Sequence, residues 1–195
     1  MVLPAGVRPV KGPRFPIAPL ERLREAGLAI RYVVLGPILD ADEGAALERE
    51  LATRSWCSRL EARPGEVASA LREADLVLNC SVVEGFSNAV AEALACGRAV
   101  LASTNAGNRN AIEHDRTGVL YQEGDAQDFE AKARRLLGDR DLRARLGEAA
   151  RDMAARRFDP AREIDGLLDS YAFALAQARR GPRVVRGRAL PVAPL

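Results

Sequence analysis

Only three cysteines and a single histidine occur among the 195 residues of the sequence. Cys57, Cys80 and Cys96 are odd in number and lack the spacing of a disulfide framework or a metal site, which favours a reducing compartment. Cys80 and Cys96 are expected to fill the core rather than to act as nucleophiles. His114 falls in a predicted loop, and we expect it to be a surface residue.

Long apolar runs are also missing. None approaches the roughly 20 residues of a membrane-spanning helix, and the N-terminus lacks the charged-then-apolar pattern of a signal peptide. Apolar residues make up 48% of the chain and charged residues 29%, which is typical of a globular protein. We therefore expect a soluble, cytoplasmic protein with one folded domain of ordinary size.

Acidic residues are absent from the end of the chain. Residues 179–195 contain five arginines and no acid, so the net charge of +2 for the whole chain leaves −3 for residues 1–178. The segment is rich in Pro and Gly and has no periodicity, which predicts a disordered tail after a folded domain of residues 1–178. Such a tail can touch an anionic membrane or a nucleic acid, but a solvated end is the simpler interpretation, and we expect no nucleic-acid partner.

What the sequence does contain is an alternation of short apolar runs with longer segments of helical period. The runs are rich in β-branched residues and end at Gly or polar residues, as buried strands do. They lie at the N-terminus and at residues 29–36, 75–81 and 98–104, with weaker candidates at 55–62 and 117–124. Helical segments lie between them at 18–27, 41–55, 65–74 and 86–97, and three more follow at 125–139, 140–158 and 160–178. This order predicts a doubly wound parallel α/β sheet with C-terminal helices.

One strand-to-helix corner carries the strongest signal for a ligand site. The stretch "LVLNCSVVEGFSNAVAEAL" reads as a strand, a short loop and a helix that begins near Gly85 or Phe86. Ligands of open parallel sheets bind at the carboxyl ends of strands, and the free N–H groups of a helix N-terminus favour a phosphate. Gly85 allows close approach of the backbone, and Ser87 can add a hydrogen bond.

Two glutamates lie at this corner, eight positions apart. Along a helix that separation is a rise of about 12 Å, comparable with the reach between the two sugars of a nucleotide-sugar. A carboxylate accepts two hydrogen bonds, so Glu84 and Glu92 suit the vicinal hydroxyls of a hexose and a ribose. Spacing alone favours a plainer interpretation, in which Glu84 caps the helix and Glu92 is a solvated helix residue. Taken alone, Lys11 and Arg8 are likewise ordinary surface charges.

The segment of residues 74–125, which includes "EGFSNAVAEALACGRAVLAS", resembles the Glu-x7-Glu core of family 4 retaining glycosyltransferases, the group 1 transferases of the GT-B fold. The opening "LPAGVRPVKGP" resembles the loop that begins the C-terminal domain in this family, particularly in glycosyltransferase 1 domain-containing proteins. The resemblance extends over about residues 3–175. It implies a Rossmann-like domain, one half of a GT-B fold, with a nucleotide-sugar site.

The resemblance also implies a role for each site residue. Glu84 would bind the hydroxyls of the donor sugar and stabilise the reacting centre, and Glu92 would hold the ribose. Lys11, assisted by Arg8, would neutralise the leaving diphosphate. Backbone N–H groups of the donor-site residues would contact the sugar or the diphosphate; these residues are Gly85, Phe86 and Ser87.

The sequence departs from the family pattern at two positions. Gly6 stands where the family loop commonly carries an Arg five residues before the Lys, and Asn110 stands where an acid is common in "NAGNRNAI". Family members of this fold usually need no metal, and we see no metal-ligand cluster, so we expect neither a metal nor a cofactor beyond a UDP-, GDP- or other nucleoside diphosphate sugar donor.

The resemblance covers only the donor-binding half of a two-domain enzyme. It therefore implies a hexosyltransferase that acts with retention on an unknown acceptor and needs an N-terminal Rossmann-like domain or a partner chain. A truncated enzyme, half of a two-chain enzyme and a relic that binds without turnover all remain open. The alternative function is a non-catalytic nucleotide-sugar-binding module or subunit. The exposed interdomain face also predicts self-association into a homo-oligomer.

Overall fold

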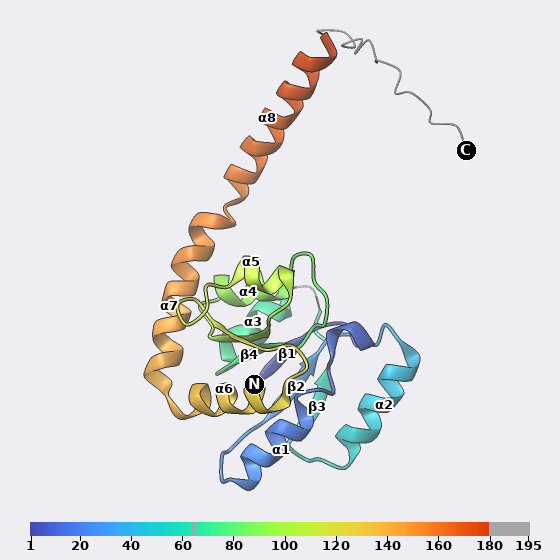
Figure 1. The fold of residues 1–195 in the computed structure, drawn as a ribbon. Helices are drawn as coiled ribbons and strands as arrows, with labels where there is room; N and C mark the ends of the chain where they lie inside the picture. Colours follow the sequence, from blue (N-terminus) through green and yellow to red (C-terminus); the bar gives the residue numbers. More distant parts are fainter. Residues whose placement is uncertain (64, 180–195) are drawn as a thin grey trace, which may run out of the picture. The chain divides into compact units, whose positions relative to one another are not determined.

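The computed structural model describes residues 1–63 and 65–179, and it divides the chain into two compact units. The first unit is Met1–Arg157 and contains the sheet, and the second is Phe158–Leu195 and contains helix α8, Pro160–Arg179. The predicted disordered tail begins at Arg179, so nearly all of it lies outside the described residues. Figure 1 shows the elements of both units.

The first unit is built on a six-stranded parallel sheet with the order β3-β2-β1-β4-β5-β6. The sheet's strands are short and largely buried, as the apolar runs predict. Their bounds are β1 Val2–Pro4, β2 Tyr32–Leu35, β3 Cys57–Leu60, β4 Val77–Asn79, β5 Val100–Ser103 and β6 Val119–Tyr121. The predicted doubly wound α/β fold is therefore confirmed, and both weaker strand candidates belong to the sheet.

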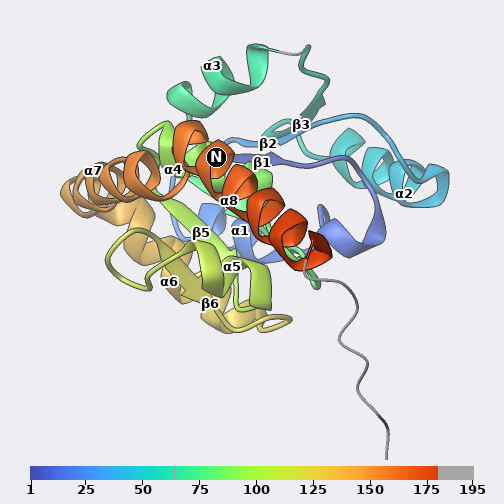
Figure 2. The same cartoon turned by 90° about the horizontal axis from the view of Figure 1, so that it is seen from above.

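Helices cover the two faces of this sheet (Figures 1 and 2). Helices α1 and α6 pack against each other on one face, while α3, α4 and α5 lie on the other and α7 packs on α4. The bounds are α1 Ile17–Glu25, α2 Ala41–Ala52, α3 Glu66–Glu73, α4 Asn88–Ala95, α5 Ala106–Ala111, α6 Ala126–Gly138 and α7 Arg140–Arg157. No described helix combines the length and the apolar character that crossing a membrane requires.

Polar side chains fix where several of these helices begin. Asp40, Ser87, Asn105 and Asp125 each accept a hydrogen bond from a backbone N–H in the first turn of α2, α4, α5 and α6 respectively. Such N-caps satisfy donors that the helix leaves free. One boundary was predicted wrongly: α4 begins at Asn88 rather than near Gly85 or Phe86, because the cap is Ser87.

The order of the strands places a topological switch point at the centre of the sheet. Strands β1 and β4 are neighbours, and the chain winds outward from them in opposite directions. The loops that follow β1 and β4 therefore lie next to each other at the carboxyl edge, which is the usual ligand position in sheets of this kind. Lys11 follows β1 and Glu84 follows β4, so both lie at this switch point.

The packing of α4 against α7 generates a first prediction. A Cβ at Gly147 of α7 would lie 2.2 Å from the backbone oxygen of Gly97, just after α4, whereas a Cβ at Gly138 of α6 would meet no atom within 4 Å. Gly147→Ala should lower the free energy of unfolding by about 1–3 kcal/mol, because backbone must move to admit the methyl group.

Gly138→Ala is the matched control. It should leave stability unchanged or raise it by about 0.5–1 kcal/mol, since Ala is the better helix former. Chemical denaturation of both variants measures the difference. Equal effects of the two substitutions would contradict the close approach of α7 to Gly97.

Candidate functional site

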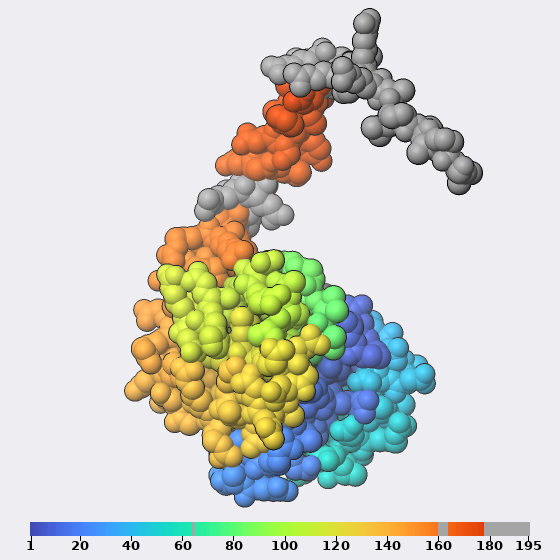
Figure 3. Space-filling view, viewed as in Figure 1, coloured from blue at the N-terminus to red at the C-terminus, as the bar shows by residue number. Residues whose placement is uncertain are grey.

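Two loops meet at the switch point of the sheet. The loop after β1 contains a short 3-10 helix, η1 (Pro9–Lys11), and the loop after β4 contains residues 80–87. The N–H of Val82 donates to the carbonyl of Val10 at 2.9 Å, which joins the two loops directly. In the space-filling view the blue N-terminal segment borders the green segment around these residues (Figure 3).

Gly12 allows this close approach. It ends η1 with φ +56°, and a Cβ there would lie 2.6 Å from the carbonyl oxygen of Cys80. A side chain would therefore be strained by its backbone conformation and would also press the two loops apart.

Aromatic residues fix the segment that follows η1. Phe15 stacks on Tyr121 with ring centroids 5.7 Å apart and meets the edge of Phe129 at 5.6 Å. The buried Tyr32 hydroxyl donates to the carbonyl of Pro13 at 2.7 Å. These contacts tie the loop to the core, so the position of Lys11 does not depend on the ion pair alone.

The side chains of Lys11 and Glu84 form an ion pair across the two loops. The Glu84 Oε1 atom also accepts a hydrogen bond from the Ser81 hydroxyl at 2.8 Å. The Lys11 side chain is 18% exposed and that of Glu84 is 10% exposed, so the pair is partly shielded from water but still open on one side. A cation and a carboxylate that lie together at the carboxyl edge of a parallel sheet can bind a phosphate and a hydroxyl-bearing group side by side.

Helix α5 holds the backbone of Glu84 in place. The N–H of Gly107, near the start of α5, donates to the Glu84 carbonyl at 3.0 Å. A Cβ at Gly107 would lie 2.7 Å from that carbonyl oxygen and 2.8 Å from the Glu84 Cβ. The glycine of "NAGNRNAI" therefore lets α5 approach the Glu84 loop closely, which spacing in the sequence did not indicate.

A buried polar cluster lies beneath the pair at the ends of β4 and β5. The Ser81 carbonyl accepts from the Ser103 hydroxyl at 2.6 Å and from the Asn105 amide at 2.9 Å. The Asn108 amide donates to Asn79 Oδ1 and to the Ser103 carbonyl, both at 3.0 Å. The cluster connects the Glu84 loop to the strands on which it stands.

Asn79 extends the same cluster to the start of α4. Its amide donates to the Ser87 hydroxyl at 3.0 Å, and that hydroxyl accepts from the N–H of Val90. The Ser87 side chain is thus occupied by the cap, and the N–H groups of Asn88 and Ala89 are the ones that the helix leaves free. Phe86 is half exposed, and a Cβ at Gly85 would meet no atom within 4 Å, so the corner is open to a ligand.

Two predicted site residues lie outside the cluster. Glu92 is exposed on α4, one turn after the helix start, and Arg8 is exposed as the residue before η1. The expected helical rise of about 12 Å between Glu84 and Glu92 does not apply, because Glu84 precedes the helix. The structure joins Lys11 and Glu84 and leaves Glu92 and Arg8 on nearby elements.

Within the described residues, no group of three His, Cys, Asp or Glu side chains could hold a metal ion. Burial raises the pKa of the Cys80 thiol to about 12, so this cysteine beneath the site is a protonated core residue rather than a nucleophile. Cys96 is only partly buried, and His114 is half exposed, as a surface residue should be.

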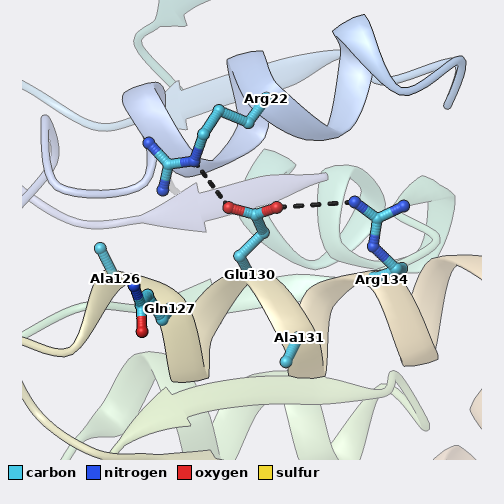
Figure 4. Close-up of a pocket in the computed structure, with 6 residues that line it drawn as sticks. All are labelled: Arg22, Ala126, Gln127, Glu130, Ala131 and Arg134. Atoms are coloured by element: carbon cyan, nitrogen blue, oxygen red, sulfur yellow. Dashed lines mark hydrogen bonds and ion pairs between the residues drawn. The ribbon is translucent and has the colours of Figure 1, made fainter.

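A groove of about 750 Å³ runs along α1 and α6, away from the two loops (Figure 4). Glu130 projects between Arg22 and Arg134 there, with its carboxylate oxygens 2.7 Å and 3.5 Å from their nitrogens. The Glu130 carboxylate lies between the two guanidinium groups, and its ion pair with Arg22 links α6 to α1. Exposed ion pairs of this kind contribute little stability.

Sequence reasoning missed the polar cluster and the contact of Gly107. A usable signal was present, because Asn and Ser residues end or follow two buried strands in "NCS" and "STN". Polar residues at the carboxyl ends of adjacent strands converge at one edge of a sheet.

The profile of the family described as "Glycosyl transferases group 1" matches residues 4–153. The D-inositol 3-phosphate glycosyltransferase of Nocardia farcinica is 33% identical over 206 residues, which cover 94% of this chain and 45% of that protein. This chain thus spans about half the length of the curated relatives that it matches.

Solved structures show the same fold. The crystal structure of Anabaena HepE in complex with UDP and glucose has a TM-score of 0.79 and 22% identity, and the match covers 88% of this chain and 48% of that one. The C-terminal domain of the glycosyl transferase group 1 family protein LpcC from Francisella tularensis has a TM-score of 0.69 and 23% identity, with 82% of this chain and 86% of that chain covered. The predicted Rossmann-like domain, one half of a GT-B fold, is confirmed.

Replacing Asn108 tests the role of the buried polar cluster. Its amide faces only acceptors, and its Oδ1 is buried without a hydrogen-bond partner. Asn108→Asp puts a carboxylate in place of the amide donor, which favours the protonated acid and raises the pKa of that carboxyl in the folded state.

The variant should therefore be close to the wild type in stability near pH 4 and lose about 3 kcal/mol or more as the pH rises to 8. Asn110→Asp, on the exposed side of the same helix, is the control and should change stability by less than about 0.5 kcal/mol. Melting temperatures from pH 4 to pH 8 give the comparison. A pH-independent loss at Asn108 would refute the donor role of its amide.

Proposed function

This chain belongs to the group 1 glycosyl transferases, and on that premise we propose that it is the donor-binding part of a glycosyltransferase, which transfers a hexose from a nucleoside diphosphate sugar to an acceptor. The observation that carries the proposal is the Lys11–Glu84 pair at the switch point of the sheet. A lysine ammonium group suits a phosphate, and the carboxylate beside it suits hydroxyl groups.

Lys11 neutralises the diphosphate as the bond to the sugar breaks, since a fixed positive charge stabilises the leaving group. Glu84 accepts hydrogen bonds from the sugar hydroxyls. The N–H groups at Gly85 and Phe86, together with the first turn of α4 after Ser87, bind the sugar or the diphosphate. Glu92 binds the ribose from the exposed face of α4, and Arg8 approaches the phosphates from the start of η1.

The donor is a UDP-, GDP- or other nucleoside diphosphate sugar, and the reaction proceeds with retention of configuration at the transferred sugar. Retention is proposed from the resemblance to family 4. The charges of Lys11 and Arg8 take the part that a metal ion plays in other transferases. We propose no metal and no separate cofactor for the reaction.

The acceptor side is proposed to come from a second Rossmann-like domain or a partner chain. The length of the relatives supports this, and so does the match to most of an isolated C-terminal domain. Apolar side chains at the carboxyl edge, Val82 and Val83 among them, are exposed and suit such a contact, or self-association in its absence.

A module that binds the donor without turnover is the second candidate, favoured by the same short length. Calorimetric titration with UDP, GDP, UDP-glucose and GDP-mannose, followed by an assay for donor hydrolysis and for transfer in the presence of an N-terminal domain, separates the two. Binding with no turnover under either condition would favour the module.

Lys11→Met generates the prediction for this site. The variant should bind UDP or GDP at least about tenfold more weakly than the wild type, because the cation for the diphosphate is lost. Lys132→Met removes the only other lysine, which pairs with Asp128 on α6, and should leave the affinity unchanged. Equal affinities of the two variants would refute the assignment of Lys11.

A further inference from the structure

We propose that Glu84 also discriminates against the spent nucleoside diphosphate, so that the site prefers the sugar-bearing donor to its own product. The inference rests on the proposed function, since it concerns the same site. It assigns to the carboxylate an effect on product affinity that is separate from its contact with the sugar.

The carboxylate is fixed close to the cation that the phosphate must reach. Lys11 pairs with Glu84 Oε1, and the Ser81 hydroxyl donates to the same oxygen at 2.8 Å. The Gly107 N–H holds the backbone of Glu84 at 3.0 Å. With these restraints the carboxylate stays beside whatever Lys11 binds.

An ammonium group has three donors, so Lys11 can contact a phosphate oxygen and Glu84 together. A bound phosphate then lies within a few ångströms of the carboxylate. Both side chains are mostly buried, with exposures of 18% and 10%, and repulsion between partly buried charges is screened less than at the surface.

The two ligands differ in charge at this point. In a nucleotide sugar the phosphate next to the sugar is a diester with one negative charge. In the free nucleoside diphosphate the terminal phosphate loses a second proton near pH 6, so at pH 7.5 it carries close to two negative charges. Glu84 therefore repels the product more strongly than the donor.

Hydrogen bonding acts in the same direction. A carboxylate only accepts hydrogen bonds, and so does a fully ionised terminal phosphate, so the product offers Glu84 no donor. The sugar of the nucleotide donor carries hydroxyl groups that donate. The Lys11–Glu84 pair therefore favours binding of the intact donor and weakens binding of the product after transfer.

The test is the affinity for UDP, with GDP and ADP measured in parallel to find the preferred base. Calorimetric titration of the full chain at pH 7.5 and low salt compares the wild type with Glu84→Gln, which keeps the shape and removes the charge. We expect Glu84→Gln to bind the preferred diphosphate about tenfold more tightly. The affinity for UDP-glucose, or the corresponding sugar nucleotide, should not rise in parallel.

Glu73→Gln is the matched control, because it removes the same charge from an exposed position at the end of α3, outside the proposed site. It should not tighten diphosphate binding. If Glu84 acts only on the sugar, Glu84→Gln should leave the diphosphate affinity unchanged. If Glu84 is only structural, the substitution should weaken diphosphate binding. Either result would overturn the inference while leaving the proposed function intact. A wild-type chain that binds none of the three diphosphates would overturn both.

Discussion

The ion pair between Lys11 and Glu84 is the interaction on which the site depends. It joins the loops that follow β1 and β4, the two strands at which the sheet reverses its order. Parallel winding alone brings these loops to one edge, and the side chains then place opposite charges within contact. The same two groups that neutralise each other in the free chain are suited to separate parts of a nucleotide sugar.

The pair is supported by polar residues that are buried rather than exposed. Ser81, Ser103, Asn105 and Asn108 hydrogen-bond one another under the Glu84 loop, and Gly107 brings α5 against its backbone. Disturbing a buried network of this kind costs folding free energy, because a polar group that loses its protein partner has no water to replace the hydrogen bond. These hydrogen bonds connect the Glu84 loop to β5 and α5, which lowers the cost of ordering the loop on ligand binding.

Much of the fold was predictable because buried strands and capped helices leave strong local patterns. Glu84 was identified from its place after a predicted strand, whereas Lys11 was assigned to the site only by the family resemblance, because taken alone it is an ordinary surface charge. The topology explains why the two meet, since it brings the ends of β1 and β4 together. The start of α4 was predicted near Gly85 or Phe86 because the sequence pattern allows either, whereas the hydrogen bond from the Val90 N–H to the Ser87 side chain makes Asn88 the first residue. The contact of Gly107 with Glu84 links two segments of the fold in a way that no local pattern records.

The diphosphate of a nucleotide sugar is proposed to bind between η1 and the start of α4. A crystal structure of the chain grown with UDP-glucose, or with UDP where the sugar is lost, would locate the nucleotide. Phosphate oxygens are expected within hydrogen-bond distance of the Lys11 ammonium group, with the sugar beside Glu84. A nucleotide bound elsewhere, for example in the groove along α1 and α6, with Lys11 and Glu84 still paired and uncontacted, would contradict it.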